Sequence, residues 1–293
     1  MAVAAAPAGR DRPLLGIGLM CLAVLCLTVQ DSTAKHLALS YPLGEVVWAR
    51  YAFNLIFLLP LLAIAGHRAP WRSARLGLQM LRGVAMITAT GLMFLSVSLL
   101  PLAETYAISF LAPLFVAGLA VPALGEKVTP RRWAAIALGF LGVLVVARPG
   151  TGVLGPAALA PVAMAFFFAV YQLATRRLAA FDHPYTTMFF SAGIGTALTS
   201  LLLPSLFVMP APGDWVLMGV MGLLGLAGQL AMIRAFAFGD ASLIAPFVYT
   251  QILWAVAIGW SVFGDLPDAW TLAGAAIVVS GGLWLLRQQA RGG

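Results

Sequence analysis

The sequence predicts an all-α polytopic membrane protein with ten transmembrane helices arranged as two inverted five-helix repeats. Composition indicates the class: 62% of the 293 residues are apolar and only 9% are charged, and the mean hydropathy is +0.98. A soluble domain has about 25% charged residues, because its surface must be hydrated. The composition therefore suits lipid as the main solvent and leaves no room for a soluble catalytic domain.

Ten apolar runs, bounded by charged residues, proline or glycine, account for the predicted helices. A spanning helix needs about 20 apolar residues, and it satisfies its own backbone polar groups in lipid. A membrane β-barrel would instead need alternating segments of about ten residues, and none is seen. The predicted spans are residues 14–37, 43–65, 76–98, 102–123, 131–148, 153–175, 185–208, 213–236, 241–263 and 268–287.

Two stretches of the chain look like copies of one unit. The run P-L-F-V-A-G-L-A-V-P-A-L-G-E-K-V-T-P leads into a span with Gly139 and Gly142, and the run Q-I-L-W-A-V-A-I-G-W-S-V-F-G-D-L-P-D leads into one with Gly274 and Gly281. Each copy ends a group of five spans, and the odd number gives the two groups opposite orientations. Inverted repeats are the architecture of secondary transporters. The predicted organisation is a cytoplasmic tail (1–13), a first repeat (14–148), a second repeat (149–287) and a second cytoplasmic tail (288–293).

The positions of Lys and Arg predict the orientation. With the N-terminus in the cytoplasm, inner segments hold twelve of the 17 Lys and Arg residues, outer segments hold two, and spans hold three. The positive-inside rule then places both termini in the cytoplasm. No small-residue cleavage site follows the first apolar run, so we expect this span to be uncleaved. The net charge of +7 is expected to reflect topology and contact with anionic lipid, and nucleic-acid binding is not implied.

Four motifs carry a resemblance to a known family: L-P-L-A-E-T-Y-A-I-S-F-L-A-P-L-F (Leu100–Phe115), L-G-E-K-V-T-P-R-R-W (Leu124–Trp133), F-G-D-A-S-L-I-A-P-F (Phe238–Phe247) and W-A-R-Y (Trp48–Tyr51). With these motifs and the repeat, the chain resembles the EamA-type members of the drug/metabolite transporter superfamily. Among them it looks closest to a bacterial aromatic amino acid exporter. The resemblance implies a protein of the bacterial inner membrane, built as a basket of ten helices around a central cavity. The spans 14–37, 76–98, 102–123, 153–175, 213–236 and 241–263 would line the cavity, and 131–148 and 268–287 would act as scaffold.

Charged residues inside the predicted spans are candidate gates, since each costs about 2.5–3.5 kcal/mol at a helix centre. Asp31 and Lys35 lie four residues apart on one helix face, a spacing that allows them to pair. We expect an outer ionic group of Asp31, Lys35, Arg50 and Glu104, and an inner group of Arg234 and Asp240. The alternative is that these side chains reach an interface or form static pairs. Arg82, two turns from the inner end of its span, is expected to reach the inner interface in this way.

Polar and aromatic side chains near mid-depth are candidate substrate contacts, because polar atoms facing lipid would be unsatisfied. Aromatic rings would stack on a flat substrate at about 0.5–1.5 kcal/mol each. Interhelical hydrogen bonds, or rings that face lipid, explain any one of them equally well. The candidates are Tyr106, Ser109, Phe110, Phe168, Tyr171, Gln172, Gln229, Tyr249, Gln251 and Trp254.

Proline and glycine add two local predictions. Pro113 and Pro246 are expected to kink the fourth and ninth spans, since proline lacks the N–H of a helical hydrogen bond. Glycines on the eighth span, Gly219, Gly222, Gly225 and Gly228, form a smooth stripe. The stripe predicts close helix packing or a flat wall beside a substrate ring.

These observations favour a secondary transporter that exports amino acids, aromatic ones in particular, and related small metabolites by alternating access. The alternative is an exporter of cationic or amphipathic drugs or of another metabolite. The sequence contains no G-x-S-x-G, H-E-x-x-H or P-loop motif, so we expect neither an enzyme nor a user of ATP. No cofactor or metal is expected. Proton coupling and oligomeric state are left open.

Overall fold

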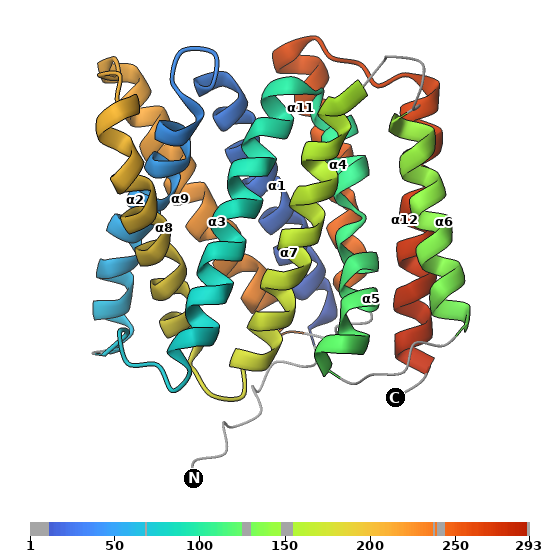
Figure 1. Cartoon of the computed structure of the whole chain (residues 1–293), viewed down its shortest axis with the longest axis horizontal. Coiled ribbons are helices and arrows are strands. Elements are labelled where there is room, and N and C mark those ends of the chain that lie inside the picture. Colours follow the sequence, from blue (N-terminus) through green and yellow to red (C-terminus); the bar gives the residue numbers. More distant parts are fainter. Residues whose placement is uncertain are drawn as a thin grey trace.

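The computed structural model describes residues 12–67, 69–124, 130–147, 155–236, 238 and 244–291, and in these residues all regular structure is helical. The helices stand side by side, and α1 begins and α12 ends at the same end of the molecule (Figure 1). In chain order they are α1 (Pro13–Leu37), α2 (Leu43–Ile64), α3 (Leu76–Leu99), α4 (Leu102–Ser109), α5 (Ala112–Leu124), α6 (Pro130–Ala147), η1 (Gly155–Ala158), α7 (Leu159–Leu178), α8 (Pro184–Leu206), α9 (Pro212–Ala235), η2 (Ala245–Thr250), α11 (Gln251–Ile258), η3 (Gly259–Phe263) and α12 (Ala269–Arg291).

Six described segments are long and apolar enough to cross a membrane: α1, α2, α3, η1 with α7, α8 and α9. Four further apolar helices are shorter, at Leu102–Val116, Ala137–Val146, Phe247–Phe263 and Ala269–Gly281. The helical class and the membrane-spanning character are therefore found as expected. The total of ten spans stays a prediction.

The segment predicted as one kinked span at 102–123 is two helices, α4 and α5, separated at Phe110 and Leu111. Pro113 lies in the first turn of α5 and has no N–H to donate to the carbonyl of Ser109, so the α4 hydrogen-bond ladder cannot continue through it. The backbone tightens instead, and Leu111 N donates to Ile108 O at 3.0 Å. Proline therefore starts a new helix here.

The segment predicted as one span at 241–263 is also discontinuous. Within its described part it consists of the 3₁₀ turn η2, the helix α11 and the π-helical turn η3. Pro246 lies at the start of η2, where its missing N–H costs little. Both prolines therefore mark helix starts, and both repeats carry a discontinuous helix of the kind found around transporter substrate sites.

Helix packing follows the repeat. The repeat relates α1 to α7, α2 to α8, α3 to α9 and α6 to α12. The main contacts are α1 on α9, α3 on α7, α2 on α8 and α6 on α12. The first two contacts exchange under the repeat relation, and the other two map onto themselves. Figure 1 shows α2 with α8 on the left side of the molecule and α6 with α12 on the right side.

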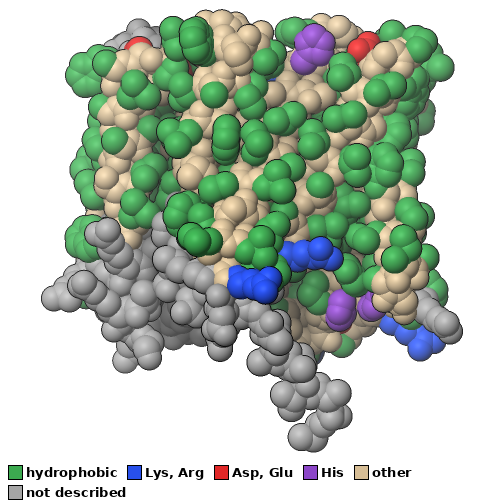
Figure 2. Space-filling model, turned by 180° about the vertical axis from the view of Figure 1, so that it is seen from behind, with side chains coloured by type: hydrophobic (Ala, Val, Ile, Leu, Met, Phe, Trp, Pro, Cys, Tyr) green, Lys and Arg blue, Asp and Glu red, His purple; other side chains and the backbone are tan. Residues whose placement is uncertain are grey.

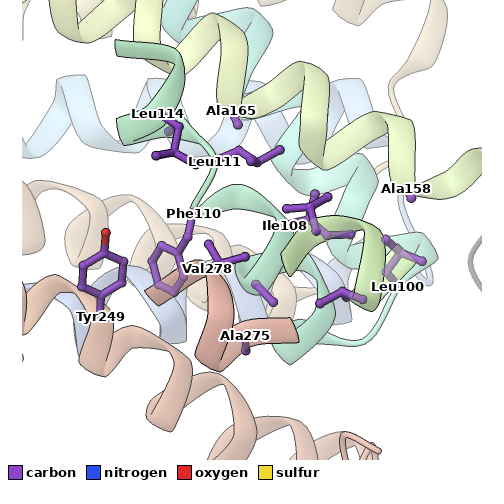
Figure 3. Packing of buried hydrophobic residues seen from close by; sticks show 14 residues of the cluster. Leu100, Ile108, Phe110, Leu111, Leu114, Ala158, Ala165, Tyr249, Ala275 and Val278 are labelled. Atoms are coloured by element: carbon purple, nitrogen blue, oxygen red, sulfur yellow. The ribbon is translucent and has the colours of Figure 1, made fainter. Parts of the chain in front are cut away.

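The two helix discontinuities meet in a buried apolar cluster (Figure 3). The ring of Phe110, at the break between α4 and α5, lies edge-on to the ring of Tyr249 in η2, with centroids 4.9 Å apart. Leu114, Ala275 and Val278 complete this part of the cluster. The expected substrate contacts Phe110 and Tyr249 are thus packed against each other across the interface between the repeats.

Glycine allows the closest helix approaches. On α6 and α12, a Cβ placed on Gly142 would lie 2.8 Å from Gly274 O, and one on Gly274 would lie 2.7 Å from Gly142 O. These two residues come from the spans that the repeat pairs with each other, and each is the closest glycine contact of the other helix. Close contact of this kind is typical of small-residue helix interfaces in membranes.

The glycine stripe of α9 also serves close packing. A Cβ on Gly222 would approach Phe53 Cβ to 2.4 Å, and one on Gly225 would approach Gln30 Oε1 to 2.2 Å. Side chains of α1 and α2 therefore occupy the stripe, and it is not a free wall beside a substrate.

The surface supports burial in lipid. Figure 2 shows hydrophobic side chains over most of one face, with Lys and Arg towards its lower edge and Asp and Glu at its upper edge. Large apolar side chains with high exposure include Leu14 (82%), Ile64 (86%) and Leu201 (76%). Such an apolar surface suits hydrocarbon. That the lower edge faces the cytoplasm stays a prediction.

Gly274→Ala is expected to destabilise the protein by about 1–3 kcal/mol, because the new methyl group meets backbone atoms of α6 that cannot move away. Thermal unfolding of the purified protein in detergent measures the effect. The matched control is Gly91→Ala, where a Cβ has no neighbour within 4 Å. Equal stability of the two variants would show that the α6–α12 crossing tolerates a wider separation.

Candidate functional site

A narrow pocket lies at mid-depth between the two repeats, and it has room for about one water molecule. Helices α2 and α3 of the first half form one side, and α7, α8 and α9 of the second half form the other. The family resemblance implied lining by the spans of α3, α7 and α9 but not by those of α2 and α8. The lining residues are Arg50, Tyr51, Asn54, Met86, Tyr171, Met188, Ser191, Ala192 and Gln229.

Arg50 is buried in α2, with 7% of its surface exposed. Its Nη1 donates to Thr90 Oγ1 at 3.1 Å, and the same hydroxyl lies 2.8 Å from Tyr51 Oη. The guanidinium also lies 5.6 Å from the ring centres of Tyr51 and Phe94. Neutral groups thus hold this expected gate residue at the pocket wall.

Arg82 was expected to reach the inner interface, and that expectation is wrong, because only 5% of the residue is exposed. Its Nε donates to Thr175 Oγ1 at 2.7 Å, and Nη1 donates to Thr187 O at 2.8 Å. Its other partners are Ser191 Oγ and Tyr171 Oη, the latter 2.9 Å from Nη2. These acceptors from α7 and α8 replace the water that the guanidinium would otherwise seek.

A signal for this site exists in the sequence. Thr175, Thr187 and Ser191 lie within two turns of the inner ends of their helices, and Arg82 lies at a similar depth in α3. Hydroxyls on two other spans at the depth of an intramembrane arginine would have indicated buried acceptors. Depth alone does not say which helices are neighbours.

Three expected site residues of α7 and α9 cluster beside the pocket. Tyr171 and Gln229 line it, and the ring of Phe168 stacks on that of Tyr171 with centroids 5.5 Å apart. The Arg82 guanidinium lies 4.5 Å from the Tyr171 ring centre. Gln172 is half-buried and is not among the lining residues.

Asp31 is the centre of a second polar group, between α1 and α4. Tyr106 Oη donates to Asp31 Oδ2 at 2.6 Å, and Gln30 Nε2 donates to Asp31 Oδ1 at 3.3 Å. The Gln251 side chain lies next to the Tyr106 hydroxyl. Arg50 is the basic group that acts on Asp31 through its charge.

The expected pair of Asp31 with Lys35 is wrong, because Lys35 has a different acidic partner. Its Nζ lies 2.8 Å from Asp265 Oδ2 and 3.4 Å from Leu100 O, and it sits 4.6 Å from the centre of the Phe263 ring. Asp31 is held by Tyr106 a full turn deeper, whereas Lys35 in the last turn of α1 reaches the end of η3. The ion pair therefore joins the first half to the second.

The other expected gate residues are not brought together. Glu104 Oε1 accepts a hydrogen bond from Thr271 Oγ1 at 3.4 Å. Arg234 is exposed in the last turn of α9, and Asp240 lies outside the described residues. The proposed inner pair is therefore not tested.

Two expected substrate contacts near the helix breaks, Ser109 and Trp254, contact other residues of the protein. Ser109 Oγ donates to Thr105 O of its own helix at 2.6 Å. Trp254 packs partly buried against the cluster of Met20, Val24 and Ile244, and its Nε1 has no hydrogen-bond partner. Only Trp254 of this pair offers a free polar atom.

Polar contacts tie the halves together at the end where the α8–α9 connection lies. Tyr41 Oη donates to Asp214 Oδ2 at 2.6 Å and accepts from Ala211 N at 3.1 Å. Val208 N donates to Glu45 Oε2 at 3.0 Å. These contacts, which we call the upper latch, join the α1–α2 connection to the α8–α9 connection.

A corresponding lower latch joins the α2–α3 connection to the α7–α8 connection. Asp182 accepts hydrogen bonds from Ser73 Oγ, from Ala74 N at 2.9 Å and from Gln79 Nε2 at 2.7 Å. Burial would raise the pKa of Asp182, but these three donors outweigh burial and hold the pKa below its ordinary value. His183 stacks on His67, and burial together with His67 lowers the pKa of His183.

Among the described residues no group of three or more His, Cys, Asp or Glu side chains is placed to hold a metal ion.

Residues 14–148 and 155–287 each match the model of the EamA-like transporter family. A riboflavin transporter of Vibrio cholerae is 30% identical over 274 residues, which covers 92% of each chain. An S-adenosylmethionine uptake transporter of Rickettsia felis is 27% identical, over 95% of this chain and 94% of its own. A pseudopaline exporter of Pseudomonas aeruginosa is 28% identical, over 90% and 93%.

A solved crystal structure of another protein is similar to this fold, with a TM-score of 0.64 at 19% sequence identity. The match covers 95% of this chain and 97% of that chain. At this identity the similarity concerns the fold alone.

Asp182→Asn is expected to lower thermal stability at pH 7 by about 1 kcal/mol, since the variant loses charge-assisted hydrogen bonds. The folded pKa of Asp182 lies below the ordinary value of 3.8, so the ionised carboxylate stabilises the fold above that value and loses this contribution as the pH falls through the lowered pKa. Unfolding measured from pH 7 to pH 3 should show the difference from wild type shrinking at the acidic end. Arg72→Gln, at an exposed residue of the facing connection, is the control. A difference of constant size across this range would exclude ionisation as its cause.

The pair Lys35–Asp265 is expected to show a coupling energy of about 0.5–1 kcal/mol in a double-mutant cycle of Lys35→Gln and Asp265→Asn. The reason is that the pair is only partly exposed, with side chains 15% and 32% accessible. Thermal unfolding provides the measurement. Lys35→Gln combined with Asp214→Asn is the matched control and should be additive, because Asp214 bonds to Tyr41. Additivity of the first cycle would mean that the ion pair contributes nothing.

Proposed function

This chain belongs to the EamA-like transporter family, and we propose that it exports amino acids, aromatic ones first among them, and related small metabolites by alternating access. The family and the named relatives are transporters, so the chain is an integral membrane transporter and not an enzyme. The direction of transport, the substrate and the roles of individual residues are proposed.

One observation carries the proposal: the midplane pocket takes one wall from each half of the molecule. Secondary transporters with inverted repeats bind substrate near the midplane and expose it by moving one half against the other. Separation of the halves would widen this pocket from the size of a water molecule to that of a metabolite. The Lys35–Asp265 ion pair must break for release on its side.

The aromatic groups at the pocket support a substrate with a flat ring. Phe168 and Tyr171 are stacked, and Tyr171 lines the pocket beside polar groups from Asn54 and Gln229. A ring that enters between the halves can stack on this pair for about 0.5–1.5 kcal/mol per contact. Riboflavin and S-adenosylmethionine, named for two relatives, also contain flat rings.

The alternative function is export of cationic or amphipathic drugs. A cation is favoured by a carboxylate in its binding site, and among the described residues Arg50 lines this pocket while no Asp or Glu does. Asp31 is buried, accepts a hydrogen bond from Tyr106 and interacts with Arg50 through its charge, and it is the carboxylate that such a drug would use. The pocket lining therefore favours the amino acid over the drug.

The test is transport into liposomes that contain the purified protein. Radiolabelled tryptophan and phenylalanine are expected to show saturable uptake, and alanine is not, because it lacks a ring. Riboflavin, S-adenosylmethionine and a cationic dye complete the panel, and an imposed pH gradient separates proton coupling from facilitated diffusion. Release of preloaded tryptophan from intact cells measures export.

Tyr171→Ala is expected to lower tryptophan transport about tenfold or more, which corresponds to the loss of one ring contact and one hydrogen-bonding group at the site. Phe140→Ala is the control, because Phe140 is an exposed ring on α6. Transport of the dye but of none of the amino acids would overturn the substrate assignment. Equal effects of the two substitutions would overturn the location of the site.

A further inference from the structure

We infer that the midplane pocket is an anion site in which Arg50 and Arg82 together bind the carboxylate group of the transported molecule. The inference rests on the proposed function for the statement that the ligand is transported. The anion site itself is argued from the buried charges and hydrogen-bond donors of the described residues.

The buried charged groups around the pocket have a net positive charge. Arg50 and Arg82 are both nearly inaccessible, and both lie close enough to Tyr51 for their charges to act on its hydroxyl. Asp31 is an acidic group whose charge interacts with Arg50, whereas the hydrogen-bond acceptors of Arg82 among the described residues are all neutral. The two arginines and Asp31 therefore sum to one positive charge in a region of low dielectric, where an unbalanced charge is costly. A carboxylate group placed beside the arginines offsets this charge locally.

The two arginines differ in how many of their N–H groups already donate hydrogen bonds. A guanidinium has five N–H groups and no acceptor. Among the described residues, Arg82 uses four of them on α7 and α8, whereas Arg50 makes one hydrogen bond, to Thr90, and lines the pocket. Arginine suits a carboxylate because its fork matches the two oxygens. Arg50 is thus the side chain with donors to spare at the pocket wall.

Arg82 would lose its hydrogen-bond acceptors if the two halves of the molecule moved apart. Arg82 lies on α3, and all four of its acceptors lie on α7 and α8. Widening the pocket removes these acceptors and leaves a guanidinium unsatisfied in the membrane, which is strongly unfavourable. A carboxylate that enters at this moment replaces the lost acceptors. Ligand binding and opening of the pocket are therefore linked through one residue.

Neutral polar groups complete the site. Asn54, Ser191 and Gln229 line the pocket with the two tyrosines Tyr51 and Tyr171, and each can donate to a carboxylate oxygen. Met86, Met188 and Ala192 make the remaining, apolar part of the wall. This lining fits a carboxylate attached to an apolar or aromatic body.

The experiment uses benzoate as the probe, with benzamide as its neutral isostere, benzylamine as a cation and sodium chloride at the same ionic strength. Binding to the purified full-length protein in detergent is measured by calorimetry and by the shift in thermal unfolding. Benzoate is expected to bind about tenfold or more tightly than benzamide, because charge-assisted hydrogen bonds to arginine exceed those of an amide. Benzylamine and chloride are expected to give no comparable stabilisation.

The variants are Arg50→Gln and Arg82→Gln, with Arg72→Gln as the control at an exposed arginine. Each pocket variant is expected to bring the ratio of benzoate to benzamide affinity close to one, and the control is expected to keep it. Arg82→Gln removes four hydrogen bonds, so this variant may be replaced by Arg50→Lys if it does not fold. Arg50→Lys keeps the charge but loses the fork, and it is expected to reduce the ratio about threefold or more.

The outcomes separate this inference from the proposed function. Equal affinity for benzoate and benzamide in the wild type, stabilisation by chloride equal to that by benzoate, or an unchanged ratio in the pocket variants would each overturn the carboxylate site. Tryptophan transport would be unaffected by such a result. Arginine-dependent benzoate binding without transport of any amino acid would instead overturn the proposed substrate and support the anion site.

Discussion

In a membrane, a buried polar group must find its partner within the protein, because lipid offers none. Here Arg82 and Lys35 find their partners across the boundary between the two halves of the chain, whereas Arg50 and Asp31 bind groups of their own half. Arg82 of α3 binds hydroxyls and a carbonyl of α7 and α8, and Lys35 of α1 binds Asp265 beyond η3. The conformation described here is therefore one in which the halves are held together at mid-depth and at the Lys35 end.

These contacts differ in character from those that hold the scaffold. The α6–α12 crossing depends on Gly142 and Gly274, whose backbones touch, and van der Waals packing of this kind has no obvious alternative arrangement. The polar contacts can exchange one acceptor for another, as Arg82 would do on binding a carboxylate. A rigid crossing at one end of the molecule and exchangeable polar contacts near its centre are what a rocking motion of two halves requires. The discontinuities at Phe110 and in η2 lie between these two regions.

Several candidate residues were identified correctly as polar groups inside spans but assigned to the wrong partner. Asp31 and Lys35 have the spacing for a pair within one helix, yet Tyr106 binds the first and Asp265 the second. Arg82 was placed at an interface because it lies near a helix end, and it is buried instead. Spacing along one helix indicates which residues share a face, but it does not indicate which helix that face meets. Phe110 and Tyr249 were expected to contact substrate, and they contact each other.

The sequence by itself determined the features that depend on composition and local pattern: the apolar helical class, the approximate ends of α1, α2, α3, α8 and α9, and the repeat that relates α6 to α12. Each of these follows from how a short segment meets lipid or its own backbone. Only the tertiary structure decided that α2 and α8 line the pocket, that Arg82 is bound by the opposite half, and that proline divides the fourth span. The physical reason is that a side chain in the membrane selects its partner by distance in three dimensions, and residues more than a hundred positions apart in the chain, such as Arg82 and Ser191, become neighbours only when the helices pack.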